Sequence, residues 1–397
     1  MTDPVANAVS PRPLPRWVAW VGFATIIAMV PLVALGGQTT TRTAGMADPV
    51  WPTSPLYLVI NSHEVYKEPR PGFLLEHTHR LAGYCVGCFA IVFAVSTWLY
   101  DRNKRRKTLA LLAMVATLGA TIAFMVFMFK IKDNPQDFGP SQAATGILAA
   151  VAALVAAVCS IGGIRGGEPG AWPRALAMLG LIGVMIQGLL GGLRVMLDYW
   201  FGDTLAPIHG CFAHVVVCMY FAAVVLCAPV SEARVLSAVD RKRIGRWILF
   251  AIALVFLQLI FGALTRHWGT ALFQRLHMLT AFAATAVVVL IATLMRTVDT
   301  IRKGYGGYAY HLLSIVFIQV ALGVEAYMGK FASVGAYANI EPRLRPITNG
   351  QAYTRTAHVL IGLTLLASLV ALAVRVYRQR STVDSVQHKD PLAVSPS

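Results

Sequence analysis

Long apolar runs constrain the fold of this chain more than any other feature. Hydrophobic residues make up 57% of its 397 residues and charged residues only 13%. The apolar runs are about 20 residues long, which suits transmembrane helices, whereas a membrane β-barrel would show short alternating segments. The sequence therefore predicts an all-α polytopic membrane protein. We expect ten transmembrane helices, at residues 17–36, 73–100, 108–129, 143–164, 175–197, 206–229, 245–265, 271–295, 308–328 and 354–377.

The basic residues indicate how the chain is oriented. The net charge is +16, from 34 Lys and Arg against 18 Asp and Glu, and the basic residues lie in short runs between apolar segments. This distribution is typical of the positive-inside rule and of contact with anionic lipid, and it argues against nucleic-acid binding. With basic loops at 101–107, 164–174, 230–246 and 296–306, both termini are expected in the cytoplasm.

A repeat organises most of the chain. Three outgoing helices contain Gln four residues before Gly, and the first helix ends in a related "VALGGQTTTR" without the Gln. After each comes an outer loop and then a helix that opens with a histidine. Four such units predict two pseudo-symmetric four-helix bundles, in which the glycines permit close helix contact. The members are Gln187/Gly191, Gln258/Gly262 and Gln319/Gly323, followed by His209, His277 and His358, with His79 after the first helix.

The repeat also predicts the domain organisation. The helices at 108–129 and 143–164 contain neither the Gln-Gly motif nor a histidine, so they form an inserted hairpin at about 103–172. The predicted parts are a disordered tail at 1–15, an N-terminal bundle at 16–230 that includes this hairpin, a C-terminal bundle at 231–380, and a second disordered tail at 381–397.

The repeat histidines predict metal ligation. All four enter from the non-cytoplasmic face, within the first turns of their helices, and are expected at similar depth. Facing imidazoles in a bundle can bind iron from both sides of a porphyrin, so the four histidines would suit two haems, one in each bundle. Zinc or copper is less favoured, because neither acidic nor thiol ligands recur beside the histidines. His209 matches the depth of the others, and His214, roughly 140° further round the helix, is the alternative ligand.

Glu76 distinguishes the first bundle from the second. It precedes His79 by three residues, so the two side chains share a helix face, and no acid occupies this position before the other repeat histidines. The asymmetry predicts that the first bundle performs chemistry and the second transfers electrons. A carboxylate there can act as base, proton relay or electrostatic stabiliser, and the alternative is pairing with Arg80. Arginines near the outer face are candidates for holding haem propionates, with interfacial snorkelling as the alternative. These arginines are Arg80, Arg194, Arg266 and Arg275.

These motifs resemble the haem A synthase family of respiratory oxidase assembly. The matching segments are "ALGGQTTTRTAGMADPVWP" after the first helix, "EHTHR" at 76–80, "QGLLGGLRV" at 187–195, "IHGCFA" at 208–213, "QRLH" at 274–277 and "AHVLIG" at 357–362. The resemblance covers most of the chain except the tails and about 103–172. It implies that His79 and His209 hold the substrate or product haem, that His277 and His358 hold haem b, that Arg80 and Arg275 bind these groups, and that Glu76 is catalytic.

The resemblance also implies an activity and a location. The expected reaction is oxidation of the C8 methyl of haem O to a formyl group, giving haem A, with haem b as cofactor. Haem O and membrane lipid are the expected partners, and the enzyme that produces haem O and a second copy of the chain are further candidates. The expected location is a bacterial-type plasma membrane, with the haem sites near the outer face. Unlike some members of the family, the chain lacks a cysteine pair in the first outer loop, and it is expected to have ten helices rather than the usual eight.

Two other functions are compatible with a membrane-embedded repeat. The first is a di-haem b-type electron-transfer protein, linked to quinol, that performs no methyl oxidation. The second is a transporter built on an internal repeat, which would need broken helices or charged residues at the midplane. The apolar runs contain few of these. Because Glu76 belongs to one bundle only, the enzyme is the favoured interpretation.

Overall fold

The fold consists of long helices. The computed structural model describes residues 14–48, 71–131, 135–196, 204–229, 236–331, 340 and 346–387, and every regular element among them is helical. Ten of these helices are long and apolar enough to span a membrane, which confirms the prediction of an integral multi-pass protein. They are α1 (Arg16–Thr41), α4 (Phe73–Trp98), α5 (Lys104–Lys130), α6 (Pro140–Arg165), α7 (Ala171–Met196), α9 (Leu205–Cys227), α10 (Ala238–His267), α11 (Ala271–Thr297), α12 (Asp299–Phe331) and α13 (Asn349–Gln387); a short 3-10 turn, η1 (Pro135–Asp137), precedes α6.

The helices extend beyond the apolar runs that predict them. α13 continues to Gln387, into the segment expected to be a tail, and α12 begins at Asp299, nine residues before its apolar run. A helix satisfies its own backbone hydrogen bonds, so it can continue from the apolar layer into the interfacial region. The tail residues 1–13 and 388–397 lie outside the described residues.

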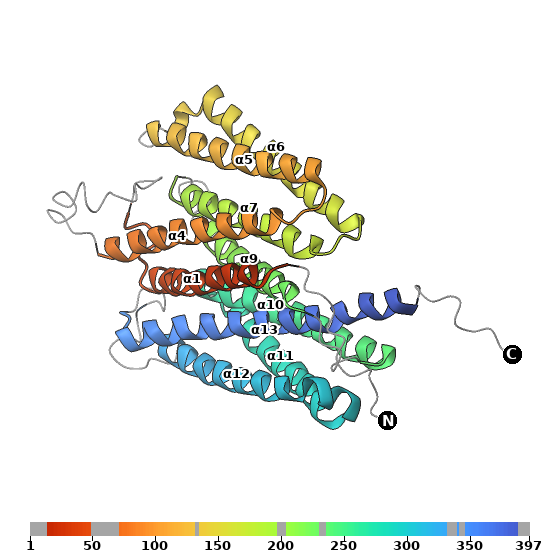
Figure 1. Ribbon diagram of the computed structural model, residues 1–397. Helices are drawn as coiled ribbons and strands as arrows, with labels where there is room; N and C mark the ends of the chain where they lie inside the picture. Colours follow the sequence, from red (N-terminus) through yellow and green to blue (C-terminus); the bar gives the residue numbers. More distant parts are fainter. Residues whose placement is uncertain are drawn as a thin grey trace.

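The helices form two groups of four with equivalent neighbours. α1, α4, α7 and α9 surround one buried core, and α10, α11, α12 and α13 surround another (Figure 1). Within the groups, the pair α1–α4 corresponds to α10–α11, and α7–α9 corresponds to α12–α13. Between the groups, α1 packs on α13 as α9 packs on α10. This exchange of equivalent contacts is the pattern that a pseudo-two-fold axis generates.

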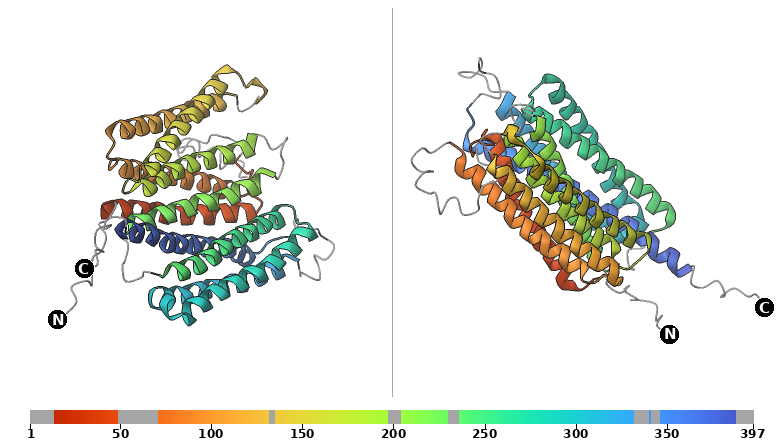
Figure 2. Two further views of the ribbon diagram at one scale, coloured as in Figure 1. Left: turned by 90° about the vertical axis from the view of Figure 1, so that its right-hand side faces the viewer. Right: turned by 90° about the horizontal axis from the view of Figure 1, so that it is seen from above.

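The inserted hairpin consists of α5 and α6, which pack mainly on each other. α6 also packs on α7, and Figure 2 shows the hairpin on the side of the first group that faces away from α11 and α12. Buried side chains such as Met114 and Ala156 join the core of the first group. The hairpin is thus an addition to the outer side of one four-helix group, and the repeat packs without it.

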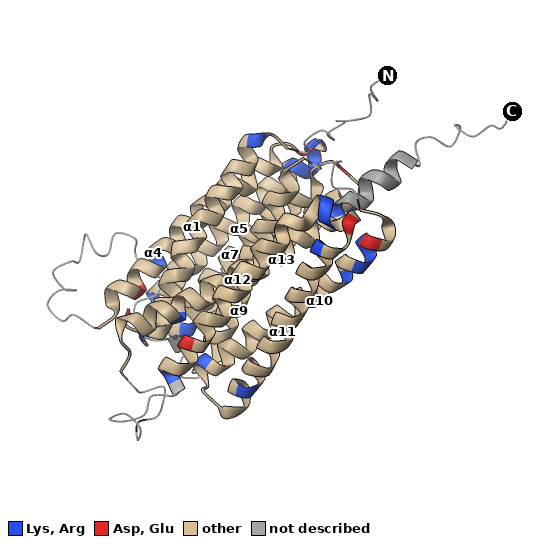
Figure 3. Cartoon of the chain, turned by 90° about the horizontal axis from the view of Figure 1, so that it is seen from below, with Lys and Arg blue, Asp and Glu red and all other residues tan. Residues whose placement is uncertain are grey.

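Charged residues gather at the two ends of the helices, and the middle is almost free of them (Figure 3). α1 begins and α13 ends at the same end of the molecule (Figure 1). We call the other end, which contains Glu76 and the four repeat histidines, the histidine end. The charge distribution fits helices that cross an apolar layer with polar regions on both sides.

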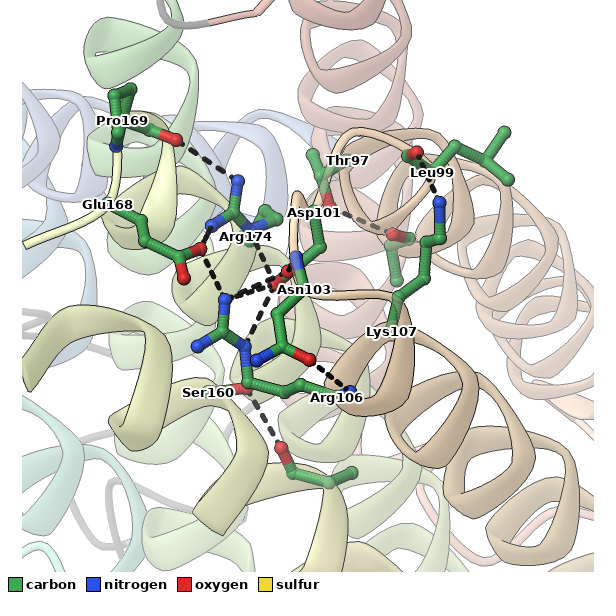
Figure 4. Close-up of polar contacts among 12 residues, drawn as sticks. Thr97, Leu99, Asp101, Asn103, Arg106, Lys107, Ser160, Glu168, Pro169 and Arg174 are labelled. Atoms are coloured by element: carbon green, nitrogen blue, oxygen red, sulfur yellow. Dashed lines mark hydrogen bonds and ion pairs between the residues drawn. The ribbon is translucent and has the colours of Figure 1, made fainter. Parts of the chain in front are cut away.

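A buried network of charges ties the hairpin to the first group at the end opposite the histidines (Figure 4). Asp101 and Arg174 are 4% and 2% exposed. Asp101 Oδ1 lies 2.8 Å from Nη2 of Arg106, and Asp101 Oδ2 lies 3.3 Å from Nε of Arg174. Glu168 pairs with both arginines, at 3.1 Å from Nη2 of Arg174. The segment 101–107, expected to be a basic loop, therefore contributes two of its charges to the protein interior.

Candidate functional site

Each repeat histidine lies against the glycine of the helix before it in the repeat. A methyl group added at the glycine would meet the Cε1 atom of the imidazole, so only hydrogen leaves enough room for the ring at the closest pairs. The glycines therefore do more than allow helices to approach: they make space for the imidazoles. The distances from an ideal Cβ to Cε1 are 2.9 Å for Gly36 and His79, 3.6 Å for Gly191 and His209, 2.8 Å for Gly262 and His277, and 2.9 Å for Gly323 and His358.

The second group brings its two histidines together. The ring centres of His277 and His358 are 6.3 Å apart and their planes are 83° from parallel. Nδ1 of His277 lies 3.0 Å from the carbonyl oxygen of Gln258, an acceptor that favours a proton on Nδ1. The unprotonated Nε2, which lies 3.5 Å from Nε2 of Gln258, then has the lone pair that can bind a metal ion. Two imidazoles bound to one metal ion from opposite sides, through bonds of ~2 Å, have centres about 6 Å apart. The observed pair has this separation.

The first group repeats the contact between Nδ1 of a histidine and a backbone carbonyl oxygen, but the residue that supplies the carbonyl is leucine instead of glutamine. Nδ1 of His79 lies 3.1 Å from the carbonyl oxygen of Leu32, which occupies the position of the repeat glutamine, four residues before Gly36. Gln187 donates to the carbonyl oxygen of His209 at 3.0 Å. Nδ1 of His209 is buried and has no hydrogen-bond partner among the described residues. Nδ1 of His358 is likewise buried without a partner in the described part of the chain, so each site has one imidazole with its proton position fixed by the backbone and one without this constraint.

His214, the alternative ligand, faces elsewhere. Its Nδ1 lies 2.7 Å from the carbonyl oxygen of Gly210 in its own helix, and the side chain is buried. His209, by contrast, contacts the repeat glycine Gly191 as the other three histidines contact theirs. The structure therefore places His209 at the position equivalent to the other repeat histidines.

Asp48, which the sequence motifs do not single out, contacts three residues of the "EHTHR" segment. Its backbone N–H donates to Oε2 of Glu76 at 2.8 Å, and its carbonyl oxygen accepts from Nη2 of Arg80 at 2.7 Å. Its carboxylate lies 3.2 Å from Nδ1 of His77 and 3.1 Å from Nη1 of Arg80. Gly72, with φ of 85°, turns the chain into α4 beside this cluster. One loop residue therefore fixes the start of α4.

Glu76 is buried inside this cluster. It is 5% exposed, and Nη2 of Arg80 lies 2.9 Å from its Oε1, so the pairing with Arg80 considered as an alternative is present. A carboxylate that is paired with a guanidinium and accepts a backbone N–H is held in one orientation. Arg80 accordingly pairs with two acids, Glu76 and Asp48.

The other candidate arginines differ in their surroundings. Arg275 is exposed on α11. Arg194, at the end of α7, packs against Gly45, whose ideal Cβ would lie 3.0 Å from both terminal nitrogens. Arg266 reaches from α10 to α1, where it donates to the carbonyl oxygen of Gly37 at 2.5 Å. Arg355, three residues before His358, was not among the sequence candidates, although its spacing from that histidine places both on one helix face.

Metal-binding groups of three or more His, Cys, Asp or Glu side chains do not occur among the described residues. His277 and His358 form a pair, and two is the largest number of axial ligands that a porphyrin iron can take from a protein. No model of a known protein family and no curated protein matches the sequence.

Proposed function

We propose that this chain is a haem A synthase-like membrane oxidoreductase. In this proposal His79 and His209 would hold haem O in the first four-helix group, where its C8 methyl is oxidised to a formyl group. This oxidation removes four electrons from the methyl carbon and adds one oxygen atom, so it requires an electron acceptor and an oxygen source, water or O2, from outside the chain. His277 and His358 would hold a haem b that transfers electrons. The main support is the His277–His358 pair, with ring centres 6.3 Å apart and a repeat glycine against each imidazole.

The residues present fit a porphyrin. Bound haem would supply the redox chemistry of both sites. The protein would supply two imidazoles for each iron, apolar bundle walls that exclude water, and, at His79 and His277, a backbone acceptor for the proton on Nδ1. The backbone acceptors at Leu32 and Gln258 support this assignment, since each lies within hydrogen-bond distance of Nδ1 of a repeat histidine.

The carboxylate of Glu76 distinguishes the first histidine site from the second. It lies one turn from His79 towards the start of α4, and Asp48 and Arg80 fix its orientation. A buried carboxylate beside the substrate can accept a proton at Oε1 or Oε2, or stabilise positive charge that develops nearby. The equivalent position before His277 is Gln274, which cannot do either in the same way. We therefore assign the oxidation to the first group.

The pairing of Glu76 with Arg80 supports one alternative function. An acid already neutralised by a guanidinium can be purely structural, and the protein would then be a di-haem b-type electron-transfer protein linked to quinol. Both functions require the same four histidines, so they differ in what the first site contains and in whether the haem there is changed.

The deciding experiment is extraction and chromatography of the haems from protein expressed with a haem O source. The enzyme predicts haem b together with haem O, a hydroxylated haem or haem A. Replacing Glu76 with Ala should leave both haems bound but abolish haem A formation, whereas Glu325→Ala, at an exposed site on α12, should behave as the wild type. Haem b alone in the wild type would favour the electron-transfer protein, and normal haem A output from Glu76→Ala would refute the assignment to Glu76.

A further inference from the structure

Two arginines at the histidine end of the second group have no carboxylate partner among the described residues. Arg266 donates from Nη2 to the carbonyl oxygen of Gly37 at 2.5 Å and to the hydroxyl of Thr41. Arg355 donates from Nη2 to the carbonyl oxygen of Gly329 at 3.3 Å, and its Nε atom is buried without a hydrogen-bond partner in the described part of the chain. Each guanidinium thus retains donors that the protein does not use.

The two arginines belong to one cluster. Gly329, which accepts from Arg355, precedes Lys330, and Nζ of Lys330 lies 3.3 Å from the carbonyl oxygen of Arg266. The charges of Arg266 and Arg355 are also near enough to interact directly. The cluster therefore gathers positive charge from α10, α12 and α13 at one place.

Helix ends compensate only part of this charge. The carbonyl groups that accept from the cluster lie in the last turns of α1, α10 and α12, and each helix end contributes about −0.5 elementary charge. Neither Arg266 nor Arg355 forms an ion pair with a carboxylate among the described residues. Both arginines are half-buried, and cations that are partly removed from water without full compensation are costly, so a bound anion would be favoured there. Planar guanidinium groups match carboxylates in particular, through two parallel hydrogen bonds.

The cluster lies next to the histidine pair. Arg355 precedes His358 by three residues, which places it on the same face of α13 and ~4.5 Å further along the helix axis towards its start. Arg266 follows Gly262 by four residues, and Gly262 is the glycine that admits the ring of His277. Both arginines therefore lie about one turn beyond the imidazoles, from two different helices.

We infer that Arg266 and Arg355 form a carboxylate-binding site that holds the propionate groups of the haem ligated by His277 and His358. The inference rests on the proposed function and adds the residues that fix the rotation of haem b in its plane. The same chemistry would recognise the phosphate of a phospholipid headgroup, so the test has to separate the two sources.

The test compares haem b with its dimethyl ester, which lacks the propionate charges. Full-length chain expressed without haem supply is titrated with each compound in detergent, and binding is followed by absorbance. The wild type should bind haem b roughly tenfold to a hundredfold more tightly than the diester, because charge-assisted hydrogen bonds are lost with the ester. Arg266→Gln and Arg355→Gln should each reduce this preference, whereas Arg243→Gln, at an exposed site near the start of α10 and away from the histidine end, should keep it.

Four outcomes distinguish a propionate site, a lipid-phosphate site and failure of the proposed function. A reduced preference with retained diester binding shows that the variant is folded and supports the site. An unchanged preference in both variants overturns the inference and leaves the proposed function standing. Loss of co-purified anionic phospholipid from the variants, with an unchanged preference for haem b, assigns the site to lipid and overturns the propionate assignment. Failure of the wild type to bind either compound overturns the inference and the proposed function together.

Discussion

Asp48 shows how one residue can determine a site to which it contributes no ligand. Its carboxylate and both of its backbone polar groups are used by Glu76, His77 and Arg80, and it is 0% exposed. Loss of its charge would remove one of the two carboxylates that pair with Arg80 among the described residues and would loosen the start of α4. Glu76 would then lose the orientation that the proposed chemistry needs.

We expect Asp48→Asn to lower both the haem A output and the free energy of unfolding. Removing one partner of a buried ion pair lowers the free energy of unfolding by up to about 3–5 kcal/mol. The haem b absorbance of the second group should remain unchanged, because the substitution lies in the first group. Asp299→Asn, which removes an exposed acid at 77% side-chain exposure, is the control. Wild-type haem A output from Asp48→Asn would show that the cluster does not position Glu76.

The glycine–histidine contacts lead to a second prediction at the same scale. In Gly323→Ala the added methyl would lie 2.9 Å from Cε1 of His358, so the ring or the helix must move. Overpacking of this kind costs about 1–3 kcal/mol and would turn the imidazole away from His277. Gly307→Ala, on the same helix and with nothing within 4 Å, is the matched control. The haem b content per protein, measured by absorbance, should fall in the first variant only; equal content in both would contradict the assigned function of Gly323.

At the scale of the helices, the buried charge network holds the inserted hairpin. Arg174 bonds Asp101 and Glu168, which lie in the connections before α5 and after α6. In Arg174→Gln these two acids would share Arg106 as their remaining partner inside the protein. We expect the free energy of unfolding to fall by about 3–5 kcal/mol, because a buried charge would be left partly uncompensated.

An exposed ion pair provides the comparison for this prediction. Arg302 and Asp299 are 2.7 Å apart but 58% and 77% exposed, so Arg302→Gln should cost about 0–1 kcal/mol. Unfolding in mixed detergent, followed by circular dichroism, would measure both. Equal losses in the two variants would mean that the network contributes no more than a surface pair, and that α5 and α6 are held by apolar packing alone.

Helices and buried contacts differ in how far the sequence predicts them. In a membrane, the backbone polar groups of an apolar run of about 20 residues must be hydrogen-bonded within the segment, and a helix achieves this. All ten helices were therefore predictable. The Gln-Gly motif and the histidine spacing also predicted which helices are equivalent. Asp48, however, lies in a polar segment without periodicity and contacts residues 28 to 32 positions away. Arg106 likewise looked like one more loop cation, because its partner Glu168 is 62 positions distant. Such contacts depend on tertiary packing, which local pattern does not encode.

At the scale of the whole molecule, two similar halves differ at a few positions next to their histidines. Three residues before the repeat histidine, α4 has Glu76 where its equivalent α11 has Gln274, and α9 has Ala206 where its equivalent α13 has Arg355. The first site therefore gains a buried acid and the second a half-buried cation on the same frame of glycine–histidine contacts. This division matches a site for chemistry beside a site for a tightly held electron carrier.

The orientation of the molecule in the membrane is the last prediction, and it is independent of any haem. Basic loops at one end predict that the histidine end faces away from the cytoplasm. Thr270, between α10 and α11 at the histidine end, and Lys303, near the start of α12 at the other end, are both exposed. In intact cells a membrane-impermeant maleimide should label Thr270→Cys, and it should label Lys303→Cys only after lysis. The wild-type chain gives the background from its own cysteines. The reverse labelling pattern would place the histidine pairs on the cytoplasmic side, and substrate haem would then have to enter from that side.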